Sequence, residues 1–162
     1  MRKINIVLYS PEIPQNTGNI SRTAAVTGAH LHIIKPIGFE ISDRTLKRAG
    51  LDYWDKLTVT YYDDYSDFLS KNAGAEMYFF SAKGKRSYAD IEYPDNVYLV
   101  FGRESVGLPM DLIRENEDRC LRIPMLGGVR CLNLSNSVAI AVYEVLRQSG
   151  FSGFSLDGSL SE

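Results

Sequence analysis

Cysteine, histidine and long apolar runs are all scarce in this sequence of 162 residues. Its two cysteines, Cys120 and Cys131, do not form a C-x-x-C pair, and His30 and His32 lie far from both. This pattern argues against a disulfide framework and against a zinc site. The apolar run near the N-terminus is short and ends at Pro11, so neither a signal peptide nor a membrane span is indicated. We therefore expect a cytoplasmic protein without membrane contact.

Several motifs of common α/β enzymes are also missing. The loop after the first predicted strand reads SPEIPQNTGN and has one glycine, Gly18, whereas a dinucleotide site would show G-x-G-x-x-G there. The sequence has no G-x-x-x-x-G-K-[ST] phosphate loop and no G-x-S-x-G nucleophile elbow, and neither histidine lies in a loop suited to a Ser-His-Asp triad. These absences count against dinucleotide binding, phosphoryl transfer and acyl transfer.

Positive charge occurs only in local groups, because the formal net charge is −2. Each group, taken alone, is more typical of a solvated face than of a binding site. If the protein binds nucleic acid, it does so through such patches. The three groups are Arg44, Lys47 and Arg48; Lys83, Lys85 and Arg86; and Arg119, Arg122 and Arg130.

Strand patterns alternate with helix patterns along the whole chain. This order predicts an α/β fold with a mainly parallel sheet and helices on both faces. The length fits one domain, which we place at 1–151, and the Gly/Ser-rich tail 152–162 is predicted to be disordered. Strands are predicted at 3–9, 30–34, 57–62, 76–81, 97–101 and 119–123. Helices are predicted at 16–27, 42–49, 65–72, 109–116 and 135–148.

In such a sheet, ligands bind beyond the carboxyl ends of the strands. The loops expected there have unusual residues, at 10–19, 81–86, 102–109 and 124–136. Asn16 and Asn19 can cap the first helix, and Arg22 lies one to two turns further on. Taken alone, this stretch is explained by capping and a surface arginine.

The two later loops are harder to explain as ordinary turns. Gly102 follows a buried strand directly, and Glu104 could accept hydrogen bonds from a ligand or from amides of a neighbouring loop. Asn133, Ser135 and Asn136 supply more caps than the last helix needs. The surplus indicates a backbone that is held in an irregular path.

Three motifs together resemble the SPOUT class of knotted RNA methyltransferases. They are N-T-G-N-I-x-R, F-G-x-E-x-x-G-L-P and I-P-M…N-L-S-N-S-V-A, in that order, and the match spans 4–150. The resemblance implies a deep trefoil knot near the C-terminus, which periodicity would not suggest because knots are nearly absent from proteins. It also implies S-adenosylmethionine as cofactor, no metal, and a homodimer in which the partner subunit completes each site.

The resemblance assigns roles to individual residues. S-adenosylmethionine would be bound largely through backbone groups at Phe80, Gly102, Ile123 and Cys131, the last at a position where relatives often have serine. The catalytic candidates are Arg22, Glu104 and Ser135. Arg22 matches the arginine proposed to assist the proton, although positioning of ribose or phosphate suits a permanently charged guanidinium better. Further candidates for holding the substrate or the loops are Asn16, Asn19, Arg130, Asn133, Asn136 and Tyr143.

The short chain is most similar to the minimal members of the class. These methylate the ribose 2′-hydroxyl of the tRNA wobble nucleotide, so we expect binding to the anticodon stem-loop, with cytidine or a modified uridine at position 34 and leucine tRNAs as substrates. Tyr143 could stack on RNA or pack at the dimer interface. The alternatives are an RNA-binding or ribosome-assembly module without catalysis, a 2′-O-methyltransferase for another RNA site, and a small-molecule enzyme.

Overall fold

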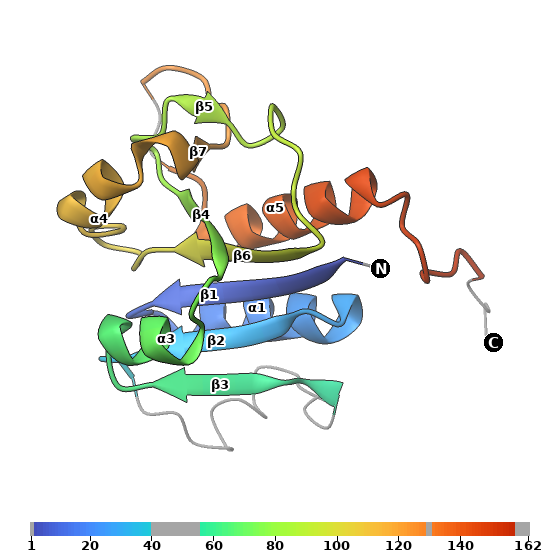
Figure 1. Cartoon of the computed structure of the whole chain (residues 1–162), viewed down its shortest axis with the longest axis horizontal. Coiled ribbons are helices and arrows are strands. Elements are labelled where there is room, and N and C mark those ends of the chain that lie inside the picture. Colours follow the sequence, from blue (N-terminus) through green and yellow to red (C-terminus); the bar gives the residue numbers. More distant parts are fainter. Residues whose placement is uncertain (1, 40–55, 129–130, 158–162) are drawn as a thin grey trace.

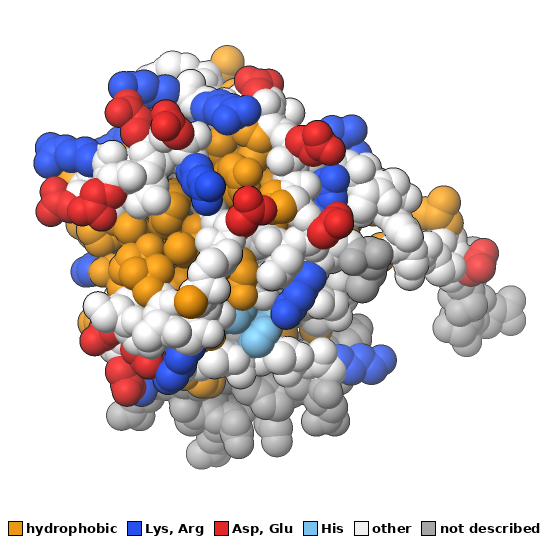
Figure 2. Space-filling model, in the orientation of Figure 1, with side chains coloured by type: hydrophobic (Ala, Val, Ile, Leu, Met, Phe, Trp, Pro, Cys, Tyr) orange, Lys and Arg blue, Asp and Glu red, His pale blue; other side chains and the backbone are white. Residues whose placement is uncertain are grey.

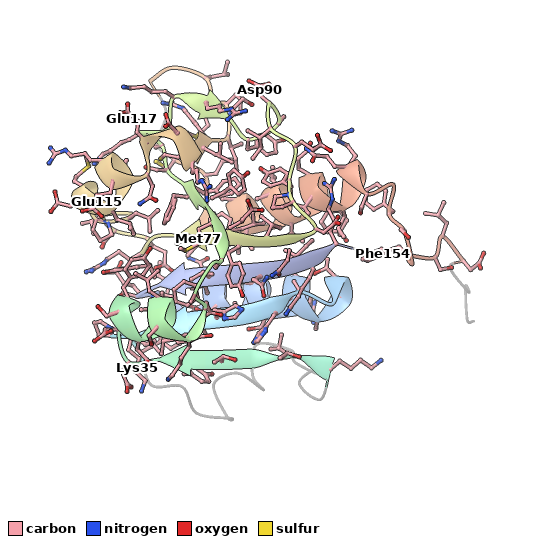
Figure 3. The ribbon with its side chains drawn as sticks, viewed as in Figure 1. Lys35, Met77, Asp90, Glu115, Glu117 and Phe154 are labelled. Carbon is pink, nitrogen blue, oxygen red and sulfur yellow. The ribbon has the colours of Figure 1, made fainter. Side chains whose placement is uncertain are left out.

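The computed structural model describes residues 2–39, 56–128 and 131–157. The predicted helix at 42–49, the basic group at 44–48 and Arg130 lie outside these residues. The domain boundary after 151 stays a prediction. Residues 152–157 extend from the end of the last helix, and there Phe154 packs against the core; Figure 3 labels it on this segment.

The strands form one sheet of seven in the order β3-β2-β1-β6-β4-β7-β5. Every neighbouring pair is parallel, which confirms the predicted α/β class. The strands are β1 (Lys3–Tyr9), β2 (His30–Ile34), β3 (Val59–Tyr62), β4 (Glu76–Phe80), β5 (Arg86–Ser87), β6 (Asn96–Phe101) and β7 (Cys120–Arg122).

Helices cover both faces of the sheet, as predicted (Figure 1). In the described part of the chain they are α1 (Pro14–Thr27), α3 (Tyr65–Lys71), α4 (Met110–Glu115), the short 3₁₀ helix η2 (Glu117–Arg119) and α5 (Leu134–Gln148). α1 and α5 pack on one face over a core that includes Ile6, Ile20 and Val142. α3 and α4 pack on the other face. Phe68 of α3 and Phe79 of β4 belong to the buried apolar cluster on that face.

The sequence did not predict β5 as a strand. It has two residues, and its partner β7 follows about 35 positions later in the chain. No local sequence pattern predicts a strand pairing this short, because the pairing exists only once β7 is in place. The other strands lie within two residues of their predicted ends.

The chain passes β7 between β4 and β5 and under the loop that joins them. Phe80 of β4 and Arg86 of β5 both pair with Leu121, from opposite sides. The loop 81–85 therefore arches over Leu121. At Gly84 the approach is so close that a Cβ would lie 2.6 Å from the Leu121 carbonyl carbon, so only glycine fits without displacement of the backbone.

A polar network lies buried on the α3 face. His32 is 2% exposed, and its ring bonds to the Tyr62 hydroxyl through Nδ1 at 2.8 Å and to Asn5 Oδ1 through Nε2 at 3.2 Å. Burial, with smaller contributions from the charges of His30 and Lys3, lowers the pKa of His32 to about 3. The native state therefore holds this imidazole neutral at physiological pH.

We expect the free energy of unfolding to fall on mild acidification. A histidine with a depressed native pKa contributes its full stability above about pH 6.5, because only the unfolded chain takes up the proton below that pH. The loss amounts to about 1.4 kcal/mol per pH unit, or about 2 kcal/mol at pH 5. Burial also lowers the pKa of His30, which acts in the same direction.

Urea titrations at pH 7.5 and pH 5 measure this loss. His32→Gln should start less stable at pH 7.5 and lose less on acidification than the wild type does. His30→Gln is the comparison: because the pKa of His30 is lowered less than that of His32, this variant should reduce the loss by less. An equal loss in the wild type and in His32→Gln would contradict the prediction.

Candidate functional site

A cavity of about 760 Å³ opens at the carboxyl ends of the central strands. Residues from all four loops expected to carry function line it: Ile13 and Asn16 from the first, 81–83 from the second, 102–108 from the third, and 125 and 131–133 from the fourth. The size falls in the range of small-molecule sites. The position is the one that a parallel sheet favours for ligands.

The four residues expected at the cofactor all line this cavity: Phe80, Gly102, Ile123 and Cys131. Phe80 stacks on Phe101, with ring centroids 4.8 Å apart. The fold thus brings together residues more than 50 positions apart in the chain. Their contacts with a cofactor stay a prediction.

Packing within its own loop requires a glycine at Gly102, whether or not a ligand approaches its backbone. A Cβ there would lie 2.2 Å from the Gly107 carbonyl carbon and from the Leu108 nitrogen. The loop's own return path therefore requires a glycine at 102, before any ligand is considered. Gly107 has φ +73° and donates its N–H to the Arg103 carbonyl at 2.9 Å, which closes the turn.

Glu104 joins the second motif to the first. Its carboxylate accepts the N–H of Glu12 at 2.8 Å, the N–H of Ile13 at 3.1 Å and Asn16 Nδ2 at 3.1 Å. In return, Glu12 accepts the N–H and the hydroxyl of Ser105, both at 2.9 Å. Of the two uses expected for Glu104, the structure supplies the contact with amides of a neighbouring loop, and its catalytic use stays a prediction.

We expect Glu104→Gln to lower the free energy of unfolding by about 1–3 kcal/mol, because one of its oxygens becomes an amide group that faces donors. Urea titration measures the loss. Glu115→Gln is the matched control, since Glu115 is exposed at the outer edge of α4 (Figure 3). Equal stability of both variants would mean that the Glu104 contacts contribute nothing.

The third motif joins the same network. Asn133 Nδ2 donates to Asn16 Oδ1 at 2.9 Å, while Asn133 Oδ1 accepts the Ser135 N–H at 2.9 Å and the Ser135 hydroxyl at 2.6 Å. Asn133 thereby caps α5. Glu104, Asn16, Asn133 and Ser135 form a continuous series of hydrogen bonds that fixes three loops around one cavity.

Other predicted residues lie away from the cavity of their own chain. Arg22 and Asn19 are exposed on α1, and Asn136 and Tyr143 are exposed on α5. None of these four is among the residues that line the cavity. Arg130 is outside the described residues.

The structure also places residues at the cavity that the sequence did not single out for it. The sequence indicates Lys83 and Arg122 only as members of basic groups, and Arg103 only as a variable position inside the second motif. All three line the cavity. Lys83 and Arg103 lie in the loops after β4 and β6, and Arg122 is the last residue of β7, so their place at the carboxyl ends of strands is the available signal.

Two of the predicted basic groups meet at the β5–β7 edge. Lys85 pairs with Glu117, and Arg86 donates to the Asp90 carbonyl at 3.2 Å; Figure 3 labels Glu117 and Asp90 there. Figure 2 shows basic side chains interleaved with carboxylates along this edge. In the described part of the chain, no helix is both long and apolar enough to cross a membrane.

The model of the SpoU rRNA Methylase family matches residues 3–143. The chain belongs to this family. Membership implies the knotted SPOUT fold, and the passage of β7 under the 81–85 arch is a threading of the kind that a knot requires.

Close relatives cover nearly the full length of this SpoU-family chain. A Listeria innocua protein, provisionally named a tRNA (cytidine(34)-2′-O)-methyltransferase, is 53% identical over 150 residues, 91% of this chain and 89% of that protein. The Escherichia coli K12 tRNA (cytidine(34)-2′-O)-methyltransferase is 45% identical over 151 residues, 93% of this chain and 96% of that one. A solved structure described as giving insights into 2-OH methylation of C/U34 on tRNA is 44% identical, covers 93% of this chain and 98% of its own, and has a TM-score of 0.87.

Proposed function

We propose that this chain transfers a methyl group from S-adenosylmethionine to the ribose 2′-hydroxyl of nucleotide 34 of tRNA, either cytidine or a modified uridine. The observation that carries the proposal is the single cavity that the three family motifs enclose. Relatives that match nearly end to end support position 34 as the target.

The cavity fits S-adenosylmethionine. Phe80, Phe101, Leu108 and Ile123 give an apolar wall for the adenine, and the loop backbones offer amides and carbonyls. When bound, the cofactor supplies an activated methyl on a sulfonium and leaves as a neutral thioether, which needs no metal to assist it. The protein's own tasks are alignment of the hydroxyl and removal of its proton.

Arg22 is the proposed proton-assisting or positioning residue, and it does not line the cavity of its own chain. We therefore propose a homodimer in which a second copy brings its Arg22 to this cavity. The outer sides of α1 and α5 support such an interface, because Val26 is 51% exposed and Tyr143 is 48% exposed on them.

The substrate is proposed to be an unstacked anticodon nucleotide, because a ribose inside a helix is poorly accessible to a deep cavity. Lys83, Lys85, Arg86 and Arg122 around the cavity and the β5–β7 edge are proposed to contact the phosphates of the anticodon stem. A tRNA substrate places the enzyme in the cytoplasm.

The test is an incubation of the purified protein with radiolabelled S-adenosylmethionine and total tRNA from a strain that lacks the gene. Nuclease digestion and mass spectrometry then map the label, with leucine tRNAs examined first. Label on a 2′-O-methyl ribose at position 34 is the expected result. Label elsewhere would discard the wobble assignment, and cofactor binding without any label would favour an RNA-binding module.

A further inference from the structure

Arg103 lines the cavity, and its side chain makes no hydrogen bond or ion pair with the described residues. Its Nε is buried and unpaired. A buried donor without a partner destabilises the folded state, and such groups in native proteins call for an explanation. A ligand that enters the cavity and accepts the hydrogen bonds of the guanidinium would provide one.

The fold holds the backbone of Arg103 in place without using its side chain. The turn that Gly107 closes on the Arg103 carbonyl fixes the residue, and Glu104 anchors the next position. Glu12 is the nearby carboxylate, but both of its oxygens already accept hydrogen bonds from Ser105. These bonds, and to a smaller extent the charge of Arg103, lower the pKa of Glu12. Glu12 therefore remains ionised near Arg103 without pairing with it.

Among the described residues, the cavity wall carries three cations, Lys83, Arg103 and Arg122, and one carboxylate, Glu104. The ammonium of Lys83 meets the sulfur of Met110 at 2.7 Å, and a thioether is a weak acceptor. Arg122 donates through one guanidinium nitrogen to the Ala82 carbonyl at 2.7 Å. The carboxylate of Glu104, also in the cavity wall, already accepts hydrogen bonds from amides of the first loop. The cations are thus incompletely balanced by the protein itself.

We propose that Arg103 is a binding residue that receives an oxyanion of the ligands in this cavity, either the carboxylate of the methyl donor or a phosphate of the substrate nucleotide. The proposal rests on the proposed function for the identity of these ligands. A guanidinium binds either group through two parallel hydrogen bonds, which a lysine cannot do.

Arg103→Gln tests the proposal, with Arg114→Gln as matched control because Arg114 is exposed, pairs with Asp111 and does not line the cavity. Calorimetry compares S-adenosylhomocysteine with 5′-methylthioadenosine, which lacks the amino-acid part. If the carboxylate is the partner, Arg103→Gln weakens binding of S-adenosylhomocysteine about 10- to 100-fold and leaves binding of 5′-methylthioadenosine unchanged. If the phosphate is the partner, both nucleosides bind normally, the KM for tRNA rises, and the salt slope of tRNA binding falls by about one.

If Arg103 served only to stabilise the fold, Arg103→Gln would give a different result. Removal of a buried, unpaired donor should leave the Tm of the ligand-free protein unchanged or raise it. A lower Tm in Arg103→Gln, or binding of both nucleosides and tRNA equal to that of Arg114→Gln, would overturn the proposal. The calorimetry needs no tRNA turnover, so a wild type that methylates no tRNA would refute the proposed function and leave the carboxylate test valid.

Discussion

Arg22→Ala is expected to abolish methyl transfer to tRNA while binding of S-adenosylmethionine stays unchanged. Loss of a group that assists proton removal or fixes the ribose lowers kcat by about 100- to 10,000-fold. The cofactor should be unaffected, because Arg22 is not part of the cavity wall that each chain supplies, and its proposed role in the dimer is at the ribose. Single-turnover transfer of labelled methyl and calorimetry with S-adenosylhomocysteine measure the two quantities separately.

Arg22→Lys is the matched control, since it keeps the charge and loses the planar fork of donors. If only charge matters, its rate stays near that of the wild type. If ribose positioning matters, it falls close to that of the alanine variant. Unchanged turnover in Arg22→Ala would remove the residue from the mechanism.

The same variant tests the proposed homodimer. Arg22→Ala has an intact cavity, and a variant with a damaged cavity still has Arg22. A mixed dimer of the two contains one complete site, so mixing should restore part of the activity that neither variant has alone. No restoration in a mixture shown to contain the mixed dimer would mean that Arg22 acts within its own chain.

Gly102→Ala is expected to weaken S-adenosylhomocysteine binding at least tenfold and to lower the Tm by several degrees. The new Cβ would lie 2.2 Å from the Gly107 carbonyl carbon and the Leu108 nitrogen, so the backbone itself has to shift. Because the loop 102–108 forms one wall of the cavity, a shift that relieves the clash also displaces the cofactor's binding groups. Calorimetry and thermal unfolding measure the two effects.

Gly127→Ala is the control for this experiment. No atom of the described residues lies within 4 Å of a Cβ built at Gly127, so the substitution should leave binding and Tm unchanged. If Gly102→Ala matched this control in both binding and Tm, the loop would be able to shift without loss of stability. The close packing of 102 against 107–108 would then not determine the shape of the cavity wall.

Much of the fold could be predicted from local patterns. The buried strands β1 and β6 have β-formers in nearly continuous apolar runs, and α5 has an apolar stripe, so the pattern that predicts each element lies within its own length. The two-residue β5 and its place beside β7 could not be predicted, since a short edge pairing has no pattern of its own.

The candidate site, like the fold, has some features that local patterns predict and others that only the folded chain creates. Periodicity and residue type alone are enough to predict the α/β class and the four loops of unusual residues. The assignment of Phe80, Gly102, Ile123 and Cys131 to the cofactor comes from the resemblance of three motifs to a known family, and it stays a prediction. Only the tertiary structure shows that Glu104 accepts hydrogen bonds from the first loop, that the turn after Gly102 requires a glycine there, and that Nε of Arg103 has no partner among the described residues. The Glu104 hydrogen bonds join residues about 90 positions apart, and the contact of Gly102 with 107–108 depends on how the loop turns back on itself. Both depend on the path of the folded backbone, which no local pattern encodes.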